Sequence, residues 1–128
     1  MFNLLLVLFC LALGLGQQTQ PVQQFDAPYR LEPIERFAGQ VVVRTSTGTT
    51  RTVRVAMRTW GIPNRQRVTL TERGYLIVQL ISGDATTVIA GERRGRKEGE
   101  FWTVAAGQDL IIETANDTAT LSVVSIQE

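Results

Sequence analysis

Carboxylates, arginines and tyrosines are the side chains with which this sequence could do acid–base chemistry. Its 128 residues include no histidine and a single cysteine, Cys10. Without histidine, neither a Ser-His-Asp nor a Cys-His nucleophile can be assembled. Zinc, copper and nonheme iron sites favour imidazole or thiolate ligands, so we expect no metal and no other cofactor. Glu72, Asp109 and Glu113 could act as acid or base only if they were buried side by side, and acids of this kind are more often exposed.

Other side chains could bind a ligand rather than transform it. Trp60 and Trp102 could stack on a sugar ring, although core packing is the more common role of tryptophan. Along one strand, alternation places Arg54, Ala56 and Arg58 on the same face, where an outward arginine stripe could bind an anion. The favoured alternative is a solvated face paired to acidic neighbours. With 13 basic and 12 acidic residues the net charge is +1, which predicts no nucleic-acid partner.

Short segments rich in β-branched residues, with period-two alternation, must position these side chains. They are separated by turn signals, including Gly83, Gly99 and Gly107, and no segment has the pattern of an amphipathic helix. This organisation predicts an all-β antiparallel sandwich or barrel. The charged run 92–97 is interpreted as the exposed face of a hairpin. The expected strands are Val41–Thr45, Thr50–Met57, Gln66–Thr71, Tyr75–Ser82, Ala85–Ala90, Phe101–Ala105, Leu110–Thr114 and Ala119–Ile126.

The N-terminal region predicts export. Residues 1–16 are uncharged and apolar and end in small residues, which is typical of a signal peptide. As a helix they would measure about 24 Å, less than the roughly 30 Å of a bilayer core, so no stable membrane span is expected after cleavage. An uncleaved anchor remains the alternative, because no basic residue precedes the apolar core. Cys10 lies inside that core behind Phe9, which does not fit a lipoprotein signal. We expect a secreted or periplasmic protein.

The mature chain is expected to have two parts. Residues 17–40 are polar and carry three prolines, which predicts an extended arm or linker. Residues 41–128 form the expected β-barrel domain.

A frame of small residues in the C-terminal half carries a family resemblance. Gly99, Ala105, Gly107, Leu110 and Thr114 have the spacing of the pattern G-x-x-x-x-x-P-x-G-x-x-H-x-x-x-N. Residues 83–124 thereby resemble the cupin superfamily, whose second motif this is. Both glycines match, whereas Ala replaces the Pro, Leu replaces the metal-binding His and Thr replaces the Asn.

The first cupin motif is matched more loosely. Its terminal Gly corresponds to Gly83, which puts Leu76 at the position of the acid. The two histidines would fall near Leu70 and Glu72, or at Thr69 and Thr71. The resemblance implies an antiparallel jelly-roll barrel without its metal ligands.

The side chains that the resemblance places in the barrel interior, and thus at a tentative ligand site, are Leu70, Glu72, Leu76, Leu110, Ile112 and Thr114. We expect a noncatalytic module that binds a small molecule or glycan, or that serves as a structural interaction domain. A homodimer is left open. The alternative is a metal-independent sugar isomerase or lyase that uses carboxylate and tyrosine. A buried ionisable pair would favour the enzyme, and an apolar interior would favour binding or structure.

Overall fold

A computed structural model describes residue 25 and residues 32–128. The predicted signal peptide and most of the predicted arm lie outside these residues. Alternating β-branched segments form strands, as expected from their period of two. The described part of the chain contains no helix, and therefore none that could cross a membrane. Its nine strands are β1 (Ile34–Arg44), β2 (Thr50–Ile62), β3 (Arg67–Thr71), β4 (Tyr75–Ser82), β5 (Ala85–Ile89), β6 (Glu92–Arg96), β7 (Phe101–Val104), β8 (Asp109–Glu113) and β9 (Ala119–Gln127).

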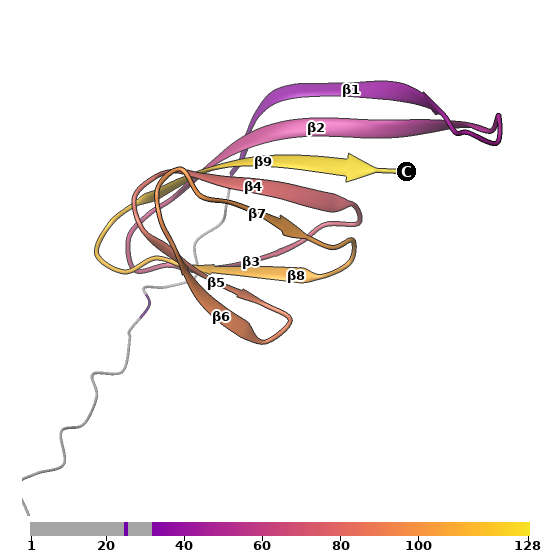
Figure 1. Ribbon diagram of the computed structural model, residues 1–128. Helices are drawn as coiled ribbons and strands as arrows, with labels where there is room; N and C mark the ends of the chain where they lie inside the picture. Colours follow the sequence, from indigo (N-terminus) through magenta and orange to yellow (C-terminus); the bar gives the residue numbers. More distant parts are fainter. Residues whose placement is uncertain (1–24, 26–31) are drawn as a thin grey trace, which may run out of the picture.

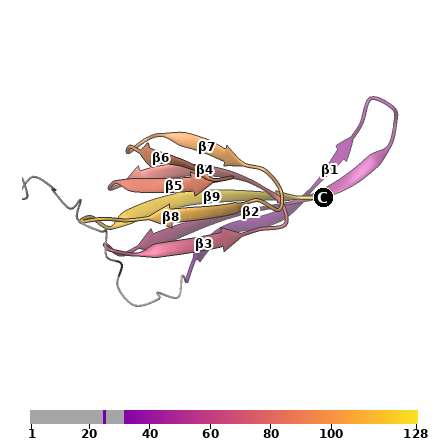
Figure 2. The same cartoon turned by 90° about the horizontal axis from the view of Figure 1, so that it is seen from below.

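The strands form two sheets that face each other (Figures 1 and 2). The longer sheet has the order β1-β2-β9-β4-β7, and the shorter has the order β3-β8-β5-β6. The pairs are antiparallel, which confirms the predicted all-β antiparallel class. Between the sheets lies one apolar core, to which both contribute alternate residues. Its members are Trp60, Ile62, Val68, Leu76, Val78, Leu80, Ala85, Trp102, Val104, Leu110, Ile112, Ala119, Leu121 and Val123.

The β1–β2 hairpin extends beyond the rest of the barrel. β9 pairs with β2 only between Arg54 and Ile62, so the part of the hairpin around its turn has no third strand beside it. Figure 1 shows this end of the hairpin reaching past β9, while the shorter sheet lies under the opposite half of the longer one. One side of the longer sheet is therefore covered over only part of its length.

Two of the predicted structural glycines differ in what they require. Gly83 has a φ of +86°, and a Cβ there would lie 2.1 Å from the carbonyl oxygen of Thr118. Gly107 has a φ of +77°, with open space around the missing Cβ. Gly83 is therefore held by both backbone angle and contact, whereas Gly107 is held by backbone angle alone. Gly99 also has a positive φ, so the three turns share the left-handed conformation.

The strand boundaries differ from expectation in two places. β1 begins at Ile34, so residues 34–40 of the predicted arm pair with β2 in the longer sheet. The run 92–97 contains a strand, β6, which the sequence pattern treated only as a charged hairpin face. Arg96 in this strand is buried rather than exposed. Both segments gain their structure from the strand beside them rather than from their own alternation.

Candidate functional site

The positions of the absent metal ligands lie inside the barrel. Leu76 on β4 and Leu110 on β8 belong to the same core and are 1% and 0% exposed, respectively. Ile112, two residues further along β8, is also fully buried, and Leu70 pairs with Leu110 in register and packs against the core. These side chains are apolar and cannot ligate a metal. Among the residues described, no group of three or more His, Cys, Asp or Glu is arranged to hold one.

Thr114 has a structural function in this interior. Its hydroxyl donates a hydrogen bond of 2.6 Å to the carbonyl of Pro63 and accepts one of 2.9 Å from the backbone N–H of Gln66. Its own N–H donates to the carbonyl of Gln66. The side chain is fully buried, so these bonds satisfy polar groups at the end of β8. Its polar capacity is directed to the backbone rather than to a ligand.

The three candidate catalytic carboxylates lie apart, each with a different partner. Glu72, between β3 and β4, forms an ion pair of 3.3 Å with Arg58. Asp109, at the start of β8, accepts a hydrogen bond of 2.5 Å from Thr71 Oγ1. Glu113, at the end of β8, forms ion pairs with two arginines from other strands. These placements do not bring two carboxylates into the shared site that acid–base catalysis by a carboxylate pair requires.

Glu113 is buried on the outer side of the shorter sheet. The sequence pattern favoured an exposed acid here, but its side chain is only 1% exposed. Arg67 on β3 lies 3.4 Å from one carboxylate oxygen, and Arg93 on β6 forms an ion pair with the other. Both arginines lie over the carboxylate while remaining about half exposed. Glu113 therefore links three strands of the sheet and is occupied by that role.

The two tryptophans belong to the core and do not form a stacking platform on the surface. Trp60 is 2% exposed and Trp102 is 7% exposed. The guanidinium carbon of Arg96 lies 4.6 Å from the centroid of the Trp102 ring, in cation–π geometry. Arg96 also donates from Nε to Thr87 Oγ1 at 2.9 Å. A buried arginine thus closes this part of the interior.

Glu100 joins Arg96 in this polar group. The backbone N–H of Lys97 donates to its carboxylate, as does the guanidinium of Arg96 at 3.0 Å. These bonds, with the positive charge of Arg94 nearby, hold the pKa of Glu100 below its ordinary value, although partial desolvation opposes them. The group anchors the β6–β7 connection and offers no paired acids.

An open hollow lies outside the barrel interior, under the longer sheet. In β2, alternation puts Arg54, Ala56 and Arg58 on the same side as the core residues Trp60 and Ile62. The sequence pattern presented these arginines as an outward stripe. They instead lie on the inner side of the sheet, where the shorter sheet does not cover it.

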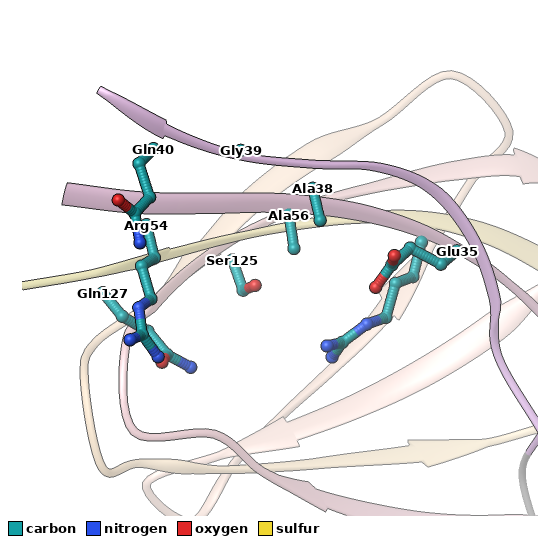
Figure 3. A pocket seen from close by; sticks show the side chains of 9 residues that line it. Glu35, Ala38, Gly39, Gln40, Arg54, Ala56, Ser125 and Gln127 are labelled. Atoms are coloured by element: carbon teal, nitrogen blue, oxygen red, sulfur yellow. The ribbon is translucent and has the colours of Figure 1, made fainter.

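We call this hollow the trough. Its first part has a volume of about 390 Å³. Figure 3 shows Arg54 and Gln127 reaching into it side by side from neighbouring strands, with Glu35 at the other end and Ser125 between that pair and Glu35. The residues that line this part are Glu35, Ala38, Gly39, Gln40, Arg54, Ala56, Arg58, Ser125 and Gln127.

The trough continues into a second hollow and carries an excess of positive charge. The second hollow, of about 510 Å³, shares Gln40, Arg54 and Gln127 with the first and adds Thr52, Arg73 and Glu128. Two ion pairs neutralise part of the lining, Arg58 with Glu72 and Arg51 with Glu128. Within the described residues, Arg54 and Arg73 have no ion-pair partner. Apart from Glu128, which pairs with Arg51, the lining contains one acid, Glu35, so its positive charge exceeds its negative charge.

Comparison with solved structures identifies the architecture. Similar chains include an RmlC-like cupin with a double-stranded β-helix fold from Methanocaldococcus jannaschii, with a TM-score of 0.53 and 21% identity over 75% of this chain and 91% of that one. The Cupin_2 domain of an XRE family transcriptional regulator from Enterobacter cloacae has a TM-score of 0.58 and 13% identity over 77% and 96% of the two chains. The protein has the cupin fold.

A third similar structure extends this result. A cupin domain from Bordetella pertussis has a TM-score of 0.56 and 10% identity, with 80% of this chain and 99% of that one covered. No family profile matches the sequence, and no curated protein matches it. At these identities the likeness establishes the cupin fold alone, so activity must be argued from this chain's own side chains.

Proposed function

We propose that this cupin-fold chain is a metal-free, noncatalytic module that binds a small anionic molecule or glycan in the trough rather than in the barrel. The observation that carries the proposal is the placement of Arg54 and Arg73, which line an open hollow without an ion-pair partner in the described chain. The packing of the barrel interior also supports the proposal, because Leu76 and Leu110 fill the space that a ligand would need there.

The lining indicates the class of ligand. Arginine binds carboxylate and phosphate groups through paired N–H donors. Beside Arg54, the amides of Gln40 and Gln127 and the hydroxyl of Ser125 offer both donors and acceptors. This combination suits a sugar acid, whose carboxylate would meet the arginine and whose hydroxyls would meet the amides. Volumes of about 390 and 510 Å³ lie within the usual range of small-molecule sites.

No feature of the site favours the alternative of a metal-independent isomerase or lyase. That reaction needs an acid and a base near one ligand. Glu72, Asp109 and Glu113 each have a separate partner, and Tyr75 is exposed on the outer side of the longer sheet.

We further propose that the module acts outside the cytoplasm, as a secreted or periplasmic protein, after cleavage that follows residue 14 or residue 16. The intact mass of protein from its native host tests this step. A mass that begins at Leu15 or Gln17 supports export with cleavage, whereas a mass that retains Met1 would favour a membrane anchor.

Galacturonate and galactose form a matched pair of probes for the trough, because they differ in the carboxylate. Titration of the isotope-labelled chain, followed by amide chemical shifts, should show galacturonate binding with a dissociation constant of about 1 mM or tighter. Galactose should bind at least about tenfold more weakly, since a charge-assisted hydrogen bond contributes about 1.5–3 kcal/mol. The shifts should map to β1, β2 and β9.

Arg54→Gln should weaken galacturonate binding by about tenfold or more for the same reason. Arg44→Gln is the matched control, because Arg44 is an exposed arginine on the same hairpin that lines neither hollow. Equal binding of the two sugars, or shifts confined to the barrel interior, would refute the trough as an anion site. So would the absence of binding at concentrations of about 10 mM, ten times the expected constant.

A further inference from the structure

The outer side of the longer sheet is apolar across four neighbouring strands, β1, β2, β9 and β4. On β2 and β4, the side chains of Trp60 and Leu76 point into the core. Those of Val55, Met57 and Ile77 point to the other side of the sheet. The register continues this side from β4 to the β1 edge of the sheet, whereas the β7 edge presents Thr103 beside Ile77 and Phe101 beside Gln79. Phe37, Met57, Val124 and Ile77 form one row of direct cross-strand neighbours, and Gly39, Val55, Ile126 and Tyr75 form the next.

We call this surface the apolar face. Its exposed members are Phe37, Val41, Val43, Met57, Tyr75, Ile77 and Phe101, and its half-buried members are Val53, Val55, Val124 and Ile126.

The aromatic residues of the apolar face are the most exposed. Phe37, Tyr75 and Phe101 are 56%, 60% and 62% exposed. The Phe37 ring lies across Gly39, close enough that a Cβ on the glycine would be 2.8 Å from it. The tip of the Phe37 ring thus lies over Gly39, while more than half of the residue remains accessible to a partner. Aromatic side chains at this exposure leave a large apolar area in water.

The area fits an interface between proteins. Three aromatic and four aliphatic side chains at the observed exposures present about 500 Å² of apolar surface. This is near the upper end of the roughly 300–600 Å² that the largest patch of a monomer usually covers. A standard interface takes about 800 Å² from each partner, of which about 60% is apolar, or about 500 Å². The apolar face alone therefore provides the nonpolar part of one side of such an interface.

The distribution of charge indicates a second copy of the same chain as the occupant. The next row on this side is polar in its middle but uncharged, and it contains Thr59, Ser122 and Gln79. The charged residues lie at the border, where Arg36 donates to Thr59 Oγ1 and Arg51 pairs with Glu128. A twofold interface brings a patch against itself, so a patch without charge meets no like charge. With a net charge of +1, two copies also repel each other only weakly.

We propose that two copies of this protein associate through their apolar faces, with the two longer sheets packed face to face about a twofold axis. The trough, on the inner side of the same sheet, remains open in this arrangement, so ligand binding and dimer formation are separate properties. The unpaired edge of β1 offers a different mode, in which two copies would join strand to strand. The uninterrupted apolar rows favour the face over the edge.

Three single variants distinguish association through the apolar faces from pairing of the β1 edges. Each is made in the full-length coding sequence and purified in the form that the host produces. Ile77→Glu puts a charge in the middle of the apolar face, on β4 and away from β1. Val41→Glu and Val42→Glu are a matched pair: Val41 lies on the apolar face, whereas Val42 is 66% exposed on the opposite side of β1.

Sedimentation equilibrium should show a dimer for the wild type and for Val42→Glu. Ile77→Glu and Val41→Glu should each weaken association by at least about tenfold, because a buried unpaired charge is costly at an interface. Circular dichroism establishes that each variant keeps its sheets. A second measurement needs no variant: in a sample that mixes isotope-labelled and unlabelled chains, the Ile77 and Met57 methyl groups should show intermolecular contacts.

A wild-type chain that stays monomeric at a protein concentration of about 100 μM, a hundredfold above a micromolar dissociation constant, would refute the proposal. A dimer that survives Ile77→Glu but is broken by Val42→Glu would replace it with edge pairing. A monomer that cosediments with phosphatidylcholine vesicles would reassign the apolar face to a lipid surface, and the proposal would again be wrong.

Discussion

Replacement of Leu110 by alanine tests whether apolar packing has closed the position of the missing metal ligand. Leu110 is 0% exposed in the core between the two sheets. The substitution removes three carbon atoms, and at about 0.8 kcal/mol for each buried CH₂ group the lost transfer free energy is about 2.4 kcal/mol. Its neighbours in register, Leu70 and Ile89, are only partly buried and can move inward. A residual cavity of about 40 Å³ then adds about 1 kcal/mol, at about 24 cal/mol per Å³.

We therefore expect Leu110→Ala to lower the free energy of unfolding by about 3–4 kcal/mol, within the range of about 2–5 kcal/mol found for such changes. Guanidinium unfolding followed by tryptophan fluorescence measures it, because Trp60 and Trp102 are both buried. The melting temperature should fall by about 12–32 °C, at about 4–8 °C per kcal/mol. Ile111→Ala is the control, since Ile111 lies on the other side of β8 and is half-buried. Its cost should be about 1 kcal/mol. A loss below about 1 kcal/mol for Leu110→Ala, with an unchanged denaturant slope, would refute a packed interior.

Three further outcomes follow from the turns, the polar group and the interior. Gly83→Ala should destabilise the protein more than Gly107→Ala in thermal melting. Both substitutions place a side chain at a positive φ, which costs about 1–3 kcal/mol, but only the first also adds a clash with Thr118. Equal costs would contradict this prediction. Because the pKa of Glu100 is lowered on folding, its stabilising contribution is present above its ordinary pKa and is lost as the pH falls through the lowered one. Glu100→Gln should therefore lose less stability than the wild type in acid unfolding, and parallel curves would argue against a role for this carboxylate. Elemental analysis of the purified chain should find no stoichiometric iron, zinc or manganese; about one tightly held ion per chain would contradict the prediction, because the chain has no histidine.

Sequence patterns predicted the antiparallel fold because each core-facing strand alternates. The predicted strand Tyr75–Ser82 has the same bounds as β4 in the structure, and its residues Leu76, Val78 and Leu80 point into the core. β6 was missed because its inward residue is Arg96, which becomes favourable only beside Trp102 and Thr87. A pattern that equates inward with apolar cannot find such a strand.

The start of β1 was missed for a related reason. Its residues are mostly exposed on both sides, so they show no alternation, and pairing with β2 determines their conformation. The trough was visible only in part. Alternation grouped Arg54 with Arg58, but which side of β2 the shorter sheet leaves uncovered depends on the packing of strands far apart in the sequence.

The position of β9 in the longer sheet determines when this sheet can form during synthesis of the chain. β9 lies between β2 and β4, although it follows every other described strand in the sequence. While residues before 119 are being synthesised, β2 and β4 have no strand to join them, and the core lacks Ala119, Leu121 and Val123. Such a nascent chain cannot complete its longer sheet before β9 has been made, so this sheet can close only late in synthesis. Loss of β9 would separate the β1–β2 hairpin from the β4–β7 pair rather than trim an edge.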